Sequence, residues 1–331
     1  MSLILTKKVV ATNAAAAKHW QETVAQRAAH NAAIANPVAS ELWAAVDAQT
    51  AQIMMPVAGE ALYNLLFPLS KTVALEDIAM MWRKAGDEFA ATSSVDGQHV
   101  KPLQRTASEW DGTVVPLHTS SFYENFREAS RNQVQFLDDQ AAATHAVRSR
   151  IVDDIFNGTP NASFKNMKSL GILNNPNVQA LDLAAAGVDF TSTTLTLALA
   201  RAGIIAIVQG LTGAGNGATG EVDILLDGAS YFNLVTLTIA NDKATSYLDV
   251  LRELPGVKSI QMENKLAGNS AIGLIANQRY IAPIVGAAVT TYAQVRAGAL
   301  DNYNYTTWAA SGLQIKADAK GRSGVLFASG V

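Results

Sequence analysis

The sequence predicts an α+β protein, and three observations support this fold class. One long amphipathic helical pattern occupies the middle of the chain, from Ser121 to Gly158. Short β-like runs separated by turn residues precede it, between Leu62 and Leu117. Apolar helical and strand-like segments alternate after it, which is typical of a compact α/β domain.

Composition narrows the classes of function. A chain of 331 residues is long enough to bury a sizeable core in two or three domains. Only 16% of its residues are charged and 49% are hydrophobic, a balance that favours burial between subunits. A formal net charge of -3 gives no basic footprint for tight, nonspecific binding of nucleic acid. The absence of cysteine excludes disulfides, thiolate nucleophiles and cysteine metal sites.

The N-terminal region, residues 1–60, is alanine-rich and has a thin apolar pattern. Asn36 and Pro37 supply a helix cap and a first-turn proline. The apolar stripe is too narrow for an independent domain, so an arm that docks on another surface is expected.

Neither export nor a membrane span is expected. The first residues place a short apolar run before two lysines, the reverse of a secretory signal. The most apolar helical run, Leu195 to Leu211, is interrupted by Arg201 and two glycines. The sequence therefore predicts a soluble protein.

Residues 61–117 predict an extended two-stranded loop. The runs LYNLLFPL, KTVAL and TVVPL are β-like, and the polar stretch between them contains Asp96-Gly97 and Asp111-Gly112. Asp-Gly between extended runs is the strongest short hairpin signal. Because an isolated hairpin is marginally stable, it needs a neighbour, and a second copy of the chain is one candidate.

The long helix has recognisable ends. Ser121 and Glu124 have capping-box spacing, and Gly158 suits a helix terminus. At 1.5 Å per residue this helix would be about 52 Å long. The apolar stripe thins at Thr144 and His145, so one face is expected to meet a partly polar surface. The alternative, a core helix of an α/β enzyme, suits the length less well, since globular helices usually have about 8 to 20 residues.

The remaining segments define a compact domain and a strand-rich tail. Pro255-Gly256 ends one predicted helix, and YFNLVTLTIA is ambiguous between helix and strand. The expected helices are FTSTTLTLALARAGIIAIVQGL and ATSYLDVLREL, and the expected strands are EVDILLD, VKSIQME, AIGLIA, DNYNYTTWA, LQIKAD and SGVLFAS.

A glycine-rich loop is the one segment that matches a cofactor motif. Gly215, Gly217 and Gly220 have the G-x-G-x-x-G spacing of a dinucleotide-binding turn. The loop follows a predicted helix and precedes a predicted strand, which is the reverse of the required context. It therefore favours a flexible loop over a cofactor site.

Other chemistry-bearing residues do not cluster in the sequence. The two carboxylates of each pair, Asp138-Asp139 and Asp153-Asp154, point about 100° apart on a helix, so they are interpreted as solvated faces or as salt-bridge partners of arginines such as Arg131, Arg148 and Arg150. Aromatic residues of the tail are interpreted as a strand packing face. No metal site is expected from the scattered histidines, which are His19, His30, His99, His118 and His145.

The order of these segments resembles the Hong Kong 97-type major capsid protein of tailed phages, a fold shared with encapsulin shells. Two phrases carry the resemblance besides the element order: LRELPGVKSI, and GILNNPNV with Gly171, Leu173, Asn174, Pro176 and Val178. The resemblance covers nearly the whole chain. It implies an N-terminal arm (1–60), an extended loop region (61–117), a peripheral domain with a spine helix (118–188), an α/β axial domain (189–290) and strands returning to the peripheral domain (291–331).

The resemblance also implies a function. The chain is expected to form hexamers and pentamers of an icosahedral shell around double-stranded DNA bound without sequence specificity. It would have no catalytic residue, cofactor, metal or membrane partner, and it would lie in the virion after assembly in the bacterial host cytoplasm. Scaffold, portal and decoration proteins are further partners. Some relatives crosslink a loop lysine to an asparagine, and only Lys101 can be nominated for that role.

Two alternatives stay open at this point. The first has the same fold and is an encapsulin-like nanocompartment shell that encloses cargo enzymes. The second belongs to a different class and is an α/β nucleotide-binding enzyme that uses the loop at Gly215.

Overall fold

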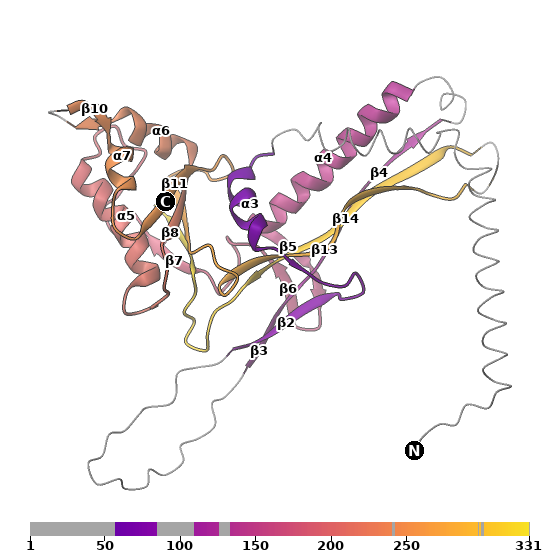
Figure 1. Cartoon of the computed structure of the whole chain (residues 1–331), viewed down its shortest axis with the longest axis horizontal. Helices are drawn as coiled ribbons and strands as arrows, with labels where there is room; N and C mark the ends of the chain where they lie inside the picture. The colour runs from indigo at the N-terminus through magenta and orange to yellow at the C-terminus, as the bar shows by residue number, and fades with distance from the viewer. Residues whose placement is uncertain are drawn as a thin grey trace, which may run out of the picture. The chain divides into compact units, whose positions relative to one another are not determined.

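The computed structural model describes residues 57–84, 109–125, 133–239, 242–296, 298 and 301–330 (Figure 1). The predictions for the N-terminal arm up to residue 56, for the Asp96-Gly97 turn and for Lys101 lie outside the described residues. The chain divides into two compact units. The first comprises Met1–Met55, Thr119–Ala146 and Thr290–Trp308; the second comprises Pro56–His118, Val147–Val289 and Ala309–Val331.

A five-stranded mixed sheet is the centre of the second unit. The strand order is β11-β8-β12-β15-β7. Strand β12 is antiparallel to both of its neighbours, whereas the pairs β11–β8 and β15–β7 are parallel. The strands are β7 (Gln179–Asp182), β8 (Val222–Leu226), β11 (Val257–Met262), β12 (Ser270–Leu274) and β15 (Val325–Ser329).

Both faces of this sheet are covered. Successive side chains of a strand point to opposite faces, and here they pack into two different cores. On β8, Ile224 packs into the core formed with helix α5 (Leu197–Thr212), and Leu225 packs into a second core. The second core contains Phe156, at the end of helix α4 (Gln133–Asn157). Gly273 lets α5 approach closely, since a Cβ there would lie 2.6 Å from Ile207 Cγ2.

Two helices predicted around this sheet begin with side-chain caps. The Thr196 hydroxyl accepts the Leu199 amide at the start of α5. Helix α7 (Tyr247–Arg252) begins with a capping box between Ser246 and Asp249. The ambiguous run YFNLVTLTIA divides into the end of helix α6 (Gly228–Thr236) and the short strand β9 (Thr238–Ile239), which pairs with β10 (Asp242–Ser246).

The region 61–117 contains a two-stranded antiparallel pair, but its strands are not the predicted runs, and two further corrections apply. KTVAL supplies only the two-residue strand β1 (Lys71–Thr72), which pairs in parallel with β13 (Ile281–Ala293). Strands β2 (Ala79–Lys84) and β3 (Glu109–Val114) are antiparallel. Asp111-Gly112 lies inside β3 instead of in a turn. The missing side chain at Gly112 leaves room for Met167 of β6 (Met167–Leu170), whose Sδ would lie 2.3 Å from a Cβ built at Gly112.

The run LYNLLFPL is the second correction, since it forms helix α3 (Glu60–Leu66) and the 3-10 turn η1 (Phe67–Leu69) instead of a strand. Leu62 and Leu66, four residues apart, are both fully buried. This helical spacing decides the local structure because it places both leucines on the face that packs into the second core.

The long helix begins later than the capping box predicts. Helix α4 is Gln133–Asn157, about 37 Å at 1.5 Å per residue, while Ser121–Glu124 belongs to strand β4 (Leu117–Glu124). Exposure alternates along β4, a period of two that a helix cannot satisfy. The predicted end is confirmed, since Gly158 follows directly with φ 71°.

Strand β4 is the edge of a four-stranded sheet with the order β1-β13-β14-β4. Its other members are β1 (Lys71–Thr72), β13 (Ile281–Ala293) and β14 (Tyr303–Ile315). The single strand β14 runs from Tyr303 in DNYNYTTWA to Ile315 in LQIKAD, so the three predicted runs form two strands, β14 and β15.

The described core of the first unit is small and aromatic. Phe122, Phe136 and Tyr305 are in mutual contact, with ring centroids 4.8 to 5.7 Å apart. Tyr305 is fully buried, which supports the interpretation of the tail aromatics as packing residues. Burial raises the pKa of the Tyr305 phenol, and the Glu124 carboxylate raises it further. On α4, Gln140 and Thr144 are buried, so the packed face is partly polar as expected.

Among the helices of the described residues, none is long and apolar enough to span a membrane.

Candidate functional site

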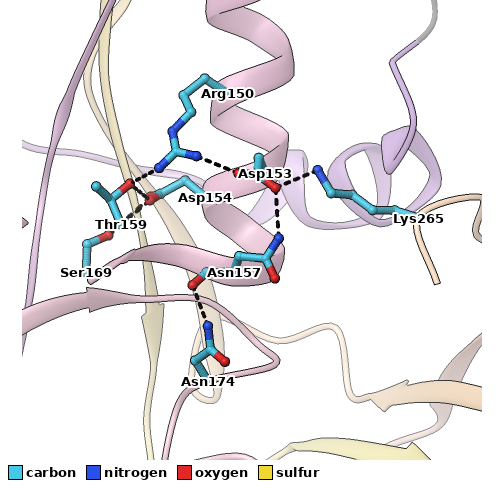
Figure 2. Close-up of polar contacts among 8 residues, drawn as sticks. All are labelled: Arg150, Asp153, Asp154, Asn157, Thr159, Ser169, Asn174 and Lys265. Atoms are coloured by element: carbon cyan, nitrogen blue, oxygen red, sulfur yellow. Dashed lines mark hydrogen bonds and ion pairs between the residues drawn. The ribbon is translucent and has the colours of Figure 1, made fainter. Parts of the chain in front are cut away.

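The C-terminal end of α4 carries a dense polar network within the second unit (Figure 2). Asp153 is its centre. One carboxylate oxygen accepts from Lys265 Nζ at 2.9 Å and from Asn157 Nδ2 at 2.8 Å, and the other lies 2.6 Å from Arg150 Nη1. Burial alone raises the pKa of Asp153, but the Lys265 and Asn157 hydrogen bonds and the charges of Lys265 and Arg150 outweigh it, so the pKa is lowered.

The neighbouring carboxylate, Asp154, is buried instead of solvated, which corrects one part of the sequence interpretation. It accepts from the Thr159 hydroxyl at 2.6 Å and from the Ser169 hydroxyl at 3.3 Å. Thr159 belongs to β5 (Gly158–Phe164), and Ser169 to β6, its antiparallel partner. Asp154 therefore fastens the β5–β6 pair to the helix end.

His118 is a second buried titratable group close to Asp154. Burial lowers the pKa of His118, the Asp154 carboxylate raises it, and the Arg150 guanidinium lowers it; the net direction is down. Burial raises the pKa of Asp154, against the hydrogen bond from Thr159 and the charge of His118. Ser169 donates to Asp154 and not to a histidine, so these residues do not form an activated nucleophile.

The phrase GILNNP caps α4. The amides of Ile172 and Leu173 donate to the carbonyls of Ile155 and Phe156, both at 2.9 Å, and Asn174 Nδ2 donates to the Asn157 carbonyl at 2.8 Å. These bonds satisfy carbonyls that a helix end leaves without partners.

Gly171 makes this cap possible. A Cβ at Gly171 would lie 2.4 Å from the carbonyl carbon and oxygen of Phe156. Gly158 lies on the opposite side of the same close approach, since its Cβ would be 2.5 Å from the Gly171 amide. The two glycines therefore allow the chain after β6 to lie directly against the helix end.

Helix α3 is held to the same end of α4. The buried Glu263 carboxylate accepts from the amides of Leu62 at 2.9 Å and Lys265 at 3.1 Å. Arg148 pairs with Glu60, and its guanidinium lies 5.9 Å from the centroid of the Tyr63 ring. The arginine partner expected for the Asp153-Asp154 pair is thus Arg150, while Arg148 has a different carboxylate.

An exposed apolar surface lies on the β2–β3 pair. Met81 and Arg83 share one face of β2 with their partners Gly112 and Trp110 on β3. The side chains of Met81 and Trp110 are 53% and 66% exposed. We call Met81 and Trp110 the hairpin face. These two large apolar side chains are diagonal neighbours on one face of the strand pair, and such an exposed apolar patch is typical of a surface that another protein covers.

The glycine-rich loop does not form a phosphate cradle. It lies between α5 and β8, the order that the sequence indicates. The Gly217 amide donates to the Gly213 carbonyl at 2.7 Å, and the Ala218 amide donates to the Leu211 carbonyl at 3.0 Å. Amides used in this way are not available to a pyrophosphate, which removes the main support for a nucleotide site at Gly215.

No group of three histidine, aspartate or glutamate side chains suited to a metal occurs among the residues that the structure describes. Of the five histidines, only His118 and His145 lie in that part of the chain. Sequence reasoning did not find Lys265, Glu263 or Ser169 as partners of the α4 end. Their distance along the chain gives no local signal.

Comparison with known proteins gives a family and a fold. Residues 31–328 match a family described as a family of unknown function, DUF6260. No curated protein matches the sequence. Among solved structures, the chain is similar to a virus-like particle protein from Pyrococcus furiosus, with 14% identity, a TM-score of 0.52, and coverage of 89% of this chain and 100% of that one.

Two phage structures are similar as well. The capsid of Myoviridae phage XM1 has 15% identity and a TM-score of 0.54, covering 80% of this chain and 91% of that one. A chain of Mycobacterium phage Bobi has 13% identity and a TM-score of 0.52, covering 81% and 91%. At these identities the likeness establishes the fold, and the α+β fold of Hong Kong 97-type capsid proteins is confirmed.

Proposed function

The chain belongs to the DUF6260 family, and on that premise we propose that it is a major capsid protein, the subunit of an icosahedral shell around the double-stranded DNA of a tailed phage. The observation that carries this proposal is the Hong Kong 97-type fold, which covers most of the chain. The shell is built of hexamers and pentamers, as the sequence resemblance implies.

The hairpin face gives the proposal a physical basis. Met81 and Trp110 leave apolar area in contact with water in a single copy. Covering a large apolar side chain contributes about 1.5–3 kcal/mol, so a neighbour that buries both residues is favoured. In a ring of identical chains, one patch meets a different patch of the next chain, and a two-stranded projection with an apolar face supplies one such patch.

The polar network at the end of α4 has a supporting role in this proposal. It fixes α3, the β5–β6 pair and the GILNNP segment to one helix end through side-chain hydrogen bonds and ion pairs. A shell subunit transmits load between its contacts, so a rigid junction suits the task. The work of the protein is then geometric, without a catalytic residue, cofactor or metal.

The proposed partners follow from the same function. Copies of the chain are the main partner, and scaffold, portal and decoration proteins are further partners. DNA is enclosed without sequence specificity, in keeping with a formal net charge of -3. The proposed location is the virion, after assembly in the cytoplasm of the bacterial host.

An encapsulin-like nanocompartment is the second candidate. The match to the virus-like particle protein favours it, since that protein is covered over its full length. Neighbouring genes for a portal and a terminase would support the phage capsid. A single neighbouring gene for a cargo enzyme would support the nanocompartment.

Electron microscopy of the purified full-length protein tests the proposal. Hollow particles or curved sheets are the expected result, alone or with a scaffold protein supplied. Compact single molecules at every concentration, with and without scaffold, would contradict it. The alternative, a nucleotide-binding enzyme, is tested by measuring the melting temperature of the protein with nucleotides. A nucleotide that binds only the folded protein must raise the melting temperature of the protein.

A further inference from the structure

A cationic pocket lies in the second unit, apart from the α4 junction. It adjoins the hairpin face, because Arg83 of its lining is the cross-strand partner of Trp110. Its volume is about 370 Å³, and its walls come from the end of β2, the glycine-rich loop, the Arg279–Tyr280 turn and the segment between β14 and β15. Five cationic side chains line it, against one carboxylate, that of Asp318. The concentration of positive charge is unexpected in a chain whose formal net charge is -3.

Two of the five cations are neutralised within the protein. Lys84 pairs with Asp111 at 2.9 Å, and Arg322 pairs with Asp318. The other three are Arg83, Arg279 and Lys316, and none of them pairs with a carboxylate of the described residues. The pocket therefore has an excess of positive charge that its own carboxylates do not balance.

Lys316 shows the electrostatic cost of this arrangement. Burial lowers the pKa of its ammonium group, and the positive charge of Lys71 lowers it further. Lys71 donates to Gln314 Oε1 at 3.2 Å, so it has a neutral acceptor and no anion there. An anion in the pocket would offset both effects.

The walls of the pocket are held in place without a ligand. The buried Asn216 side chain donates to the carbonyls of Leu211 and Ser323 and accepts from the Ser323 amide at 2.8 Å, which ties the glycine-rich loop to the β14–β15 segment. Asp318 accepts from the amides of Lys320 and Arg322, both at 2.9 Å, and so fixes the turn that carries Arg322.

We propose that this pocket binds a phosphate-bearing ligand through the side chains of Arg279 and Lys316, with Arg83 at the edge that adjoins the hairpin face. A guanidinium offers a planar pair of donors that matches a phosphate, and an ammonium adds a point charge. The volume exceeds what one phosphate needs, so a polyphosphate or consecutive backbone phosphates of a nucleic acid fit the same donors. Side chains supply the binding, since the Gly217 and Ala218 amides are already bonded.

Binding of two probes to the full-length protein tests this proposal. Tripolyphosphate is titrated by calorimetry, and a fluorescein-labelled DNA duplex of arbitrary sequence is followed by anisotropy, both at about 50 mM and 200 mM salt. The variants are Lys316→Gln and Arg279→Gln. The matched controls are Arg201→Gln and Lys168→Gln, which remove exposed cations outside the pocket. Unchanged melting temperatures in the absence of ligand establish that each variant is folded.

We expect each pocket variant to weaken binding about tenfold and each control to change it less than about twofold. Weakening of tripolyphosphate alone assigns the pocket to a free polyphosphate, and weakening of the duplex assigns it to nucleic-acid phosphates, with a salt slope about one unit smaller in the variant. Binding of neither probe at low salt, or an equal loss in the controls, would overturn the proposal. Sedimentation of each sample before titration shows whether the protein is at its subunit mass of 35.0 kDa, so the binding result is read separately from shell formation.

Discussion

The five-stranded sheet and the β2–β3 pair differ in how completely the chain covers them. Every residue of β8 and β12 is buried, and the two faces of the sheet pack into two separate cores. On the β2–β3 pair, Met81 and Trp110 stay exposed. The sheet is complete within one copy of the chain, whereas the hairpin face lacks a cover. The five-stranded sheet therefore stabilises the subunit itself, whereas the hairpin face is available to a neighbouring copy.

The largest expected effect concerns the close approach that joins α4 to the GILNNP segment. Gly171→Ala places a Cβ 2.4 Å from backbone atoms of Phe156, which cannot move without breaking the helix cap. We expect a loss of about 3 kcal/mol or more in the free energy of unfolding, measured by urea denaturation. The control is Gly215→Ala, where a Cβ meets nothing within 4 Å. Equal stability of the two variants would show that the junction is looser than the structure indicates.

A pair of alanine substitutions tests the comparison itself. Ile272→Ala removes a fully buried side chain of β12 and should cost about 2–5 kcal/mol. Met81→Ala should change the unfolding free energy of the dissociated subunit by less than about 0.5 kcal/mol, because Met81 is mostly exposed. Similar losses in both variants, measured by the same denaturation, would remove the distinction between the two regions.

A smaller effect is expected at Asp153. Asp153→Asn weakens the bonds to Lys265 and Arg150 and should cost about 1 kcal/mol at neutral pH, reduced by partial solvent exposure. Because the pKa of Asp153 is lowered in the fold, its contribution is present above the unfolded pKa and is lost as pH falls through the folded pKa. Denaturation at pH 7 and at several pH values below about 3.9 should therefore show a difference from wild type that is largest at pH 7 and shrinks as the pH falls. Asp77→Asn, at an exposed position, is the control.

The smallest effect is a pH dependence from His118. Its pKa is lowered in the fold, so the unfolded chain binds the proton more readily and stability falls as pH drops below about 6.5. We expect a loss of less than about 1 kcal/mol between pH 7 and pH 6, absent in His118→Gln. Asp154, whose pKa is raised, gives a slope of the opposite sign. An identical slope in the variant would assign the effect to other groups.

Local patterns in the sequence predicted the elements whose stabilising contacts are local. The helices α5 and α7, the strand β8 and the stop at Gly158 depend on neighbours within a few residues, and the structure confirms them. The capping box at Ser121 failed because β4 pairs with β14, and that pairing outweighs a local cap.

Contacts between distant residues could not be predicted in the same way. Asp153 meets Lys265, and Leu62 meets Glu263, only after the sheet and α4 have packed. The phrase around Gly171 was noticed as a resemblance, but its role as a helix cap needed the three-dimensional approach of Gly158 and Gly171. The cationic pocket likewise combines β2, the glycine-rich loop and the β14–β15 segment, which are far apart in the sequence.

Sedimentation velocity of the full-length protein and its Trp110→Glu variant tests whether the hairpin face joins copies of the chain. A charge at the hairpin face should oppose burial against a neighbour while leaving the five-stranded sheet intact. We expect the wild-type chain to form large assemblies. We expect the variant to be folded and to sediment at the subunit mass of 35.0 kDa. Wild-type protein that stays at the subunit mass at every concentration, with and without a scaffold protein, or a variant that assembles as well as the wild type, would contradict this prediction.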